Sequence, residues 1–98
     1  EIAGRPGSLG GDDLLRYASS LEALGEAEAA GEAYLAATRR SPGLEASYRR
    51  ASFLSRTGRD EEAEELVAGI LRGYDLLPPY AKKNEKRWAD AARRLGRR

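Results

Sequence analysis

The chain has 98 residues and a net charge of +1, with 41% hydrophobic and 34% charged residues. These values suit one helix-rich globular domain rather than a disordered chain. The sequence contains no cysteine and no histidine, which excludes disulfides, thiolate chemistry and the commonest general base and metal ligand.

The sequence starts at Glu1 and contains no methionine, so we expect an excised or processed piece of a longer protein. No apolar run approaches the roughly 20 residues that span a bilayer, so we expect no membrane span in this fragment. We expect a cytoplasmic location, and a membrane tether elsewhere in a parent chain stays open.

A flexible lead and a first helix are expected at the N-terminal end. The lead, residues 1–11, contains four glycines and a proline without apolar periodicity, which is typical of a linker. The first helix is expected to start at Asp12, as its N-cap, and to end before Gly25. Its apolar side comprises Leu14, Tyr17, Ala18, Leu21 and Leu24.

Four more helices are expected along the chain. The second is expected over about 26–40 and the third over about 44–57. The fourth is expected to start with Asp60 as its N-cap and to end before Pro78, and the fifth to start at about Pro79. The expected inward residues are Ala51 and Leu54 in the third, Ala63, Leu66, Val67, Ile70 and Leu71 in the fourth, and Ala81, Trp88, Ala92 and Leu95 in the fifth. No segment alternates with period two, so the predicted fold class is all-α.

The second helical pair matches the first at an offset of 33 residues. The matches are Ala18 with Ala51, Leu21 with Leu54, Gly25 with Gly58, Ala30 with Ala63, Tyr34 with Val67, and Ala37 with Ile70. A fixed period of this length, with two helices in each unit, indicates a helical repeat.

This pattern resembles the tetratricopeptide repeat (TPR) family, whose unit is about 34 residues. The first unit supplies Leu14, Ala18, Leu21, Gly25, Ala30, Tyr34, Ala37 and Pro42 at the family's positions, and the second supplies Ala51, Leu54, Gly58, Ala63, Val67 and Ile70. The chain departs from the family where Ala27 and Asp60 replace an aromatic residue at the start of the second helix. Ser47 departs too, because it stands where the first unit has Leu14.

The resemblance implies a short right-handed α-solenoid within residues 12–98. Repeat one covers about 12–43, repeat two about 44–78, and a capping helix about 79–96. Such arrays usually need about three repeats to be stable. We therefore expect one of three arrangements: the last helix stabilises the two repeats, the chain is part of a longer parent array, or it assembles as a homo-oligomer.

Gly31 lies in the middle of an alanine-rich helix, where glycine costs roughly 1 kcal/mol relative to alanine. We interpret it as a point, beside Ala30, at which helix backbones cross closely, and Gly69 as a second such point. The alternative is a merely tolerated glycine.

The resemblance also implies a non-catalytic protein-interaction scaffold that holds a peptide or a partner's helix in a concave groove. The expected groove residues are Arg16, Ser19, Glu22, Glu45, Tyr48, Arg49, Ser52, Ser55, Arg56, Lys82 and Lys86. Tyr48 and Arg49 are residue types that often dominate interfaces. We expect a partner segment with at least one acidic residue and one apolar anchor.

No catalytic residue, metal or cofactor is expected. The serines have no histidine to activate them, and no lysine occurs before Lys82. The acidic run over 60–65 could suggest a metal site, but acidic residues in water at a helix N-terminus are the simpler interpretation.

Charge is unevenly distributed, with −3 over residues 1–43, −2 over 44–79 and +6 over 80–98. Trp88 lies in this basic end among Lys82, Lys83, Lys86 and Arg87, a combination also found on nucleic-acid-binding surfaces. The alternative function is therefore binding of RNA or another polyanion. We favour a capping helix in which Trp88 covers the last hydrophobic layer.

Overall fold

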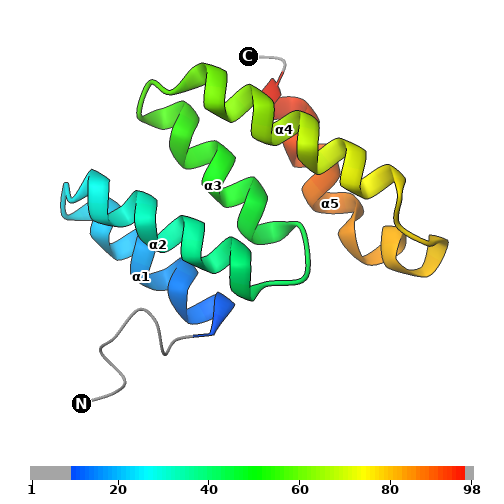
Figure 1. The fold of residues 1–98 in the computed structure, drawn as a ribbon, viewed down its shortest axis with the longest axis horizontal. Helices are drawn as coiled ribbons and strands as arrows, with labels where there is room; N and C mark the ends of the chain where they lie inside the picture. The colour runs from blue at the N-terminus through cyan, green and yellow to red at the C-terminus, as the bar shows by residue number, and fades with distance from the viewer. Residues whose placement is uncertain (1–9, 97–98) are drawn as a thin grey trace.

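Apolar side chains at helical spacing, separated by glycines and prolines, divide residues 10–96 into five helices, coloured from blue to red in Figure 1. They are α1 (Gly11–Ala23), α2 (Ala27–Arg40), α3 (Glu45–Arg56), α4 (Asp60–Asp75) and α5 (Pro79–Gly96). The computed structural model describes residues 10–96, and no β-strand occurs in that range. The predicted all-α class is confirmed.

The expected linker is only partly covered. Residues 1–9 lie outside the described residues, and α1 begins at Gly11, inside the range assigned to the linker.

Each helix packs against the next along the chain, and α3 lies at the centre (Figure 1). The α1–α2 pair lies at one end and α5 at the other, and α3 also contacts both α1 and α5. The Cα atoms extend 41 × 30 × 15 Å along the principal axes. The molecule is therefore flat. Helices α1 and α5 both neighbour α3, although α2 separates α1 from α3 in sequence and α4 separates α3 from α5.

The turns after α1 and α3 have the same geometry. Gly25 and Gly58 both have φ of 83°, the left-handed region in which glycine is favoured. After α1, the N–H of Gly25 donates to the carbonyl of Glu22 (3.0 Å) and the N–H of Glu26 to that of Leu21 (2.9 Å). Both bonds recur 33 residues later, from Gly58 to Ser55 (3.3 Å) and from Arg59 to Leu54 (2.8 Å). This pair of bonds is the Schellman ending of a helix, and the prediction for both glycines is confirmed.

The predicted N-caps are wrong by one or two residues. The N-caps are Gly10 for α1 and Arg59 for α4, and neither makes a side-chain capping bond. Asp12 and Asp60 lie inside the first turns instead. There they interact with the positive end of the helix dipole rather than bonding to free N–H groups.

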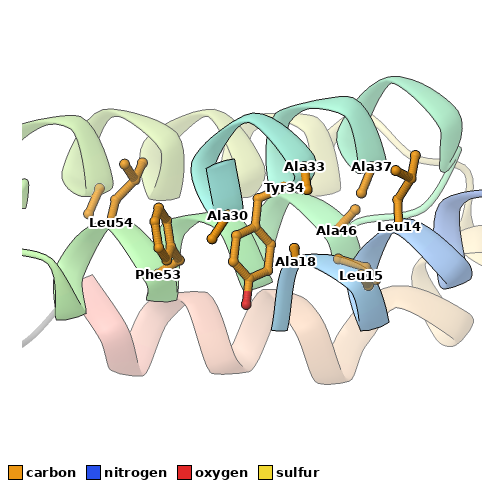
Figure 2. Close-up of a cluster of buried hydrophobic side chains, with 11 residues drawn as sticks. Leu14, Leu15, Ala18, Ala30, Ala33, Tyr34, Ala37, Ala46, Phe53 and Leu54 are labelled. Atoms are coloured by element: carbon orange, nitrogen blue, oxygen red, sulfur yellow. The ribbon is translucent and has the colours of Figure 1, made fainter. Parts of the chain in front are cut away.

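The buried core has two parts. The first, shown in Figure 2, is mostly alanine and comprises Leu14, Leu15, Ala18, Ala30, Ala33, Tyr34, Ala37, Ala46, Phe53, Leu54 and Ala63. The second joins α3, α4 and α5 through Ala51, Val67, Ile70 and Ala92. Eleven of the twelve matched repeat positions are therefore buried or lie in a matching glycine turn, and Leu21 alone among them is half-buried.

The core differs from the sequence prediction at two residues, one expected in it and one not. Leu24 is 77% exposed because α1 ends before it, so its side chain does not continue the apolar stripe. Phe53 is 3% exposed and was not identified from the sequence. Its ring packs against Tyr34, with centroids 4.9 Å apart, which places a large aromatic pair in a core otherwise built from small residues.

Gly31 does not mark a crossing of helix backbones. A Cβ added there would approach only the ring of Phe53, at 3.4 and 3.8 Å, and would have no backbone atom of another helix within 4 Å. A Cβ at Gly69 would meet only the end of Arg72, at 3.9 Å. The close-approach interpretation is therefore wrong for both glycines, and Gly31 borders an aromatic side chain instead.

Candidate partner-binding face

A cavity of about 430 Å³ lies between α1 and α3. Its lining comprises Asp12, Leu15, Arg16, Ser19, Tyr34, Glu45 and Arg49. Arg16 and Ser19 are three residues apart on α1, and Glu45 and Arg49 are four apart on α3, so each pair shares a helix face. The structure thus brings together these four residues of the groove expected from the sequence.

Glu22 and Arg56, also expected in the groove, bind each other across the ends of α1 and α3. Arg56 donates from Nε and Nη2 to the two carboxylate oxygens of Glu22, at 2.8 Å each. Its Nη1 donates to the hydroxyl of Ser52, and the hydroxyl of Tyr34 donates to Glu22 at 3.0 Å. Figure 2 shows the Tyr34 hydroxyl pointing away from the buried cluster. A two-bond guanidinium–carboxylate contact fixes the relative position of its partners.

The pKa values of this network follow from the same contacts. The hydrogen bonds from Arg56 lower the pKa of Glu22, and the carboxylate in turn raises the pKa of Arg56. Burial raises the pKa of Tyr34, and its hydrogen bond to Glu22 raises it further. Glu22 is therefore ionised and Tyr34 neutral at pH 7, which keeps the network intact.

An aromatic pair continues this surface from α3 onto α5. The rings of Tyr48 and Trp88 have centroids 5.9 Å apart. The guanidinium carbons of Arg49 and Arg87 lie 5.4 and 4.6 Å from the centre of the Trp88 ring. Each such contact adds about 0.5–1 kcal/mol at an exposed site. We call the α1–α3 cavity together with this cluster the α1–α3–α5 face.

Arg49 links the two halves of this face. Its Nε donates to Glu45 at 2.8 Å, and Glu45 lines the cavity, while its guanidinium lies over Trp88. Apolar rings and cations that are fixed next to a polar cavity suit a partner segment with an apolar anchor and an acidic residue.

Lys82 and Lys86 are not brought to this face. The Nζ of Lys82 lies 5.7 Å from the centre of the Tyr74 ring, on α4. Lys86 donates to Asp90 at 2.8 Å, and this bond raises the pKa of Lys86 and lowers that of Asp90. Lys86 and Trp88 are two residues apart and project from nearly opposite sides of α5. The residue that α5 contributes to the face is Trp88.

Ser55 is also separate from the cavity. It lines a different hollow, of about 310 Å³, together with residues at the start of α4 and the end of α5. Ser55 therefore faces the α5 side of α3, whereas Glu45 and Arg49 face α1.

Within residues 10–96, no group of three or more carboxylates is placed to hold a metal ion. The acidic residues at 60–62 occupy the first turn of α4. None of the described helices combines the length and apolar character needed to cross a membrane.

Two residues of the face were given other roles by sequence reasoning. Tyr34 was assigned to the core, and its ring is indeed buried (4% exposed), but its hydroxyl reaches Glu22. Trp88 was assigned to the capping layer. The presence of a tyrosine on an inward stripe is a signal that could have been used, because a buried tyrosine hydroxyl needs a partner.

Comparisons with known proteins return no similarity: no family model, no curated protein and no solved structure matches the chain.

Proposed function

We propose that the chain is a non-catalytic protein-interaction scaffold and that its α1–α3–α5 face binds a peptide or a helix of a partner protein. In this proposal the five helices form a short right-handed solenoid that resembles the TPR family. Helices α1–α2 and α3–α4 are the two repeats, and α5 is the cap.

The repetition of turn geometry supports the repeat. The same two backbone bonds and the same φ of 83° occur at Gly25 and Gly58. The last residues of α1 and α3, and the first residues of α2 and α4, are likewise each 33 apart. Similar units that pack in the same way place their first helices next to one another, which creates a continuous surface for an extended partner.

The composition of the α1–α3–α5 face carries the functional proposal. It combines a cavity of about 430 Å³ with a Tyr48–Trp88 pair and two arginines. Tyrosine, tryptophan and arginine are enriched among residues that dominate protein interfaces. The other aromatic pair, Tyr34 with Phe53, is buried in the core instead of lying on a face.

Polyanion binding through α5 is the weaker candidate. Lys86 and Arg93 both bond to Asp90, and Lys82 and Arg87 each lie over an aromatic ring. The bonds to Asp90 partly neutralise two basic side chains that the alternative function requires to face phosphates.

The proposal is tested by affinity capture from a cell lysate with four versions of the chain: wild type, Tyr48→Ala, Arg49→Glu and Lys83→Glu. Lys83 is exposed on α5 and serves as the matched control. A protein retained by wild type and Lys83→Glu, and lost from the other two variants at unchanged helical content, supports the proposal. A specific partner retained equally by all four versions contradicts it.

A further inference from the structure

A second cavity, of about 480 Å³, lies between α2 and α3, on a side of α3 other than the one that faces α1. Residues of α2 and α3, with Arg59 just before α4, line it: Ala27, Glu28, Gly31, Glu32, Leu35, Arg50, Phe53, Leu54, Thr57 and Arg59. Ala27, Gly31 and Leu35 supply its accessible apolar part, above the buried Phe53 and Leu54. We call this cavity the α2–α3 groove.

Charges of opposite sign line the two walls of the groove. Glu28 and Glu32 are one turn apart on α2, so they share a helix face. Arg50 stands on α3, and Arg59 precedes α4. Within residues 10–96, none of these four side chains forms a hydrogen bond or an ion pair with another part of the chain.

The α1–α3–α5 face is different in this respect. Arg16 and Arg49 each bond to a carboxylate of the same chain. The unpaired charges of the α2–α3 groove can pair with opposite charges of a partner, which favours the rate and the orientation of association.

We infer that the α2–α3 groove is a second docking site, for a segment of a partner protein that carries an apolar side chain between a basic and an acidic residue. The apolar side chain packs over Gly31, against Leu35 and the edge of the Phe53 ring. The basic residue faces Glu28 and Glu32, and the acidic residue faces Arg50 and Arg59. A segment with only one sign of charge leaves one wall unpaired.

This inference gives Gly31 a role that its helix position does not explain. A Cβ at residue 31 would lie 3.4 Å from the Phe53 ring, in ordinary contact. Gly31→Ala is therefore tolerated sterically, and it gains up to about 1 kcal/mol of helix propensity. A longer side chain at residue 31 extends into the groove and occupies the place of the partner's apolar anchor.

The test uses a phage-displayed library of random peptides, selected on the wild-type chain and counter-selected on Gly31→Leu. We expect enriched peptides with an apolar residue flanked by one basic and one acidic residue. Affinity should fall about fivefold or more both for Glu28→Lys/Glu32→Lys and for Arg50→Glu/Arg59→Glu, since each double change replaces attraction with repulsion. Peptides in which the two charges are exchanged should bind the variant that carries all four changes.

Tyr48→Ala is the control that separates the two sites, and it should leave these affinities unchanged. Circular dichroism checks that each variant is folded, and Gly31→Gln, whose side chain also extends into the groove, replaces Gly31→Leu if the leucine disturbs the helix. Failure to enrich any peptide that distinguishes wild type from the residue 31 variant overturns the inference. The inference is also overturned if Tyr48→Ala abolishes peptide binding. It is overturned as well if peptide affinity depends only on the two glutamates or only on the two arginines of the groove.

Discussion

Arg56 on α3 donates two hydrogen bonds of 2.8 Å to the carboxylate of Glu22 on α1. The two residues are 34 positions apart in the chain, and their contact joins the C-terminal ends of the two helices. Both were expected among the residues of the partner-binding groove. Their mutual pairing means that they position α1 against α3 and so shape the cavity between these helices.

Replacing Glu22 with Gln should lower the free energy of unfolding at pH 7 by about 1 kcal/mol, a modest value because Arg56 is half-exposed. A double-mutant cycle with Arg56→Gln should give a coupling energy of similar size, measured by urea denaturation. A coupling energy near zero would mean that the contact contributes nothing to stability.

The stability of the wild-type chain should also depend on this pair at acid pH. Because Arg56 lowers the pKa of Glu22 in the folded state, the pair contributes fully above the ordinary value of 4.5. The contribution is lost as the pH falls through the lower, folded value. Glu22→Gln should therefore show a smaller loss of melting temperature than wild type between pH 5 and pH 2. Identical profiles for the two proteins would contradict this assignment.

Gly25→Ala and Gly58→Ala should each destabilise the chain by about 1 kcal/mol, since alanine at φ of 83° is strained. The two losses should be similar because the two turns have the same bonds. Gly69→Ala is the matched control. It lies inside α4 with only the Arg72 side chain within 4 Å, and should be neutral or stabilising by up to about 1 kcal/mol. Thermal melts followed by circular dichroism measure all three, and a harmless Gly25→Ala would refute the strained-turn account.

The fold was largely predictable, because helix boundaries depend on local signals. Gly25 and Gly58 end their helices as expected, and a period of 33 residues correctly paired the buried positions of the two units. Positions at the ends of helices were harder. Leu24 has the right spacing for the core, but it follows the last turn of α1, so no neighbouring helix covers it.

The candidate site was predictable only in outline. Helical spacing groups Arg16 with Ser19 and Glu45 with Arg49 on their own helices, as the structure does. It does not determine how α5 is rotated against α3, and this rotation brings Trp88 rather than Lys86 to the face. The surroundings of Gly31 were not predictable either. Its neighbour is the Phe53 ring on α3, and residue spacing within α2 cannot indicate a contact with another helix.

The salt dependence of nucleic-acid binding separates the two candidate functions. We expect only weak association with single-stranded RNA, which disappears near physiological salt, because residues 1–79 carry a net negative charge. Fluorescence anisotropy with a labelled oligonucleotide over a range of salt concentrations measures this. Submicromolar binding that persists at physiological salt, and that is weakened by Lys83→Glu, would favour the polyanion function.

The most direct test of the central claim is to map a bound partner segment by NMR. A peptide from a captured partner is titrated into the ¹⁵N-labelled chain, and the titration is repeated with Tyr48→Ala. The account predicts chemical-shift changes that centre on Tyr48, Arg49 and Trp88, and a loss of about 1 kcal/mol or more of binding free energy in the variant. Shift changes confined to residues outside the α1–α3–α5 face, such as those around Glu28, Glu32 and Glu64, with affinity unaffected by Tyr48→Ala, would contradict it.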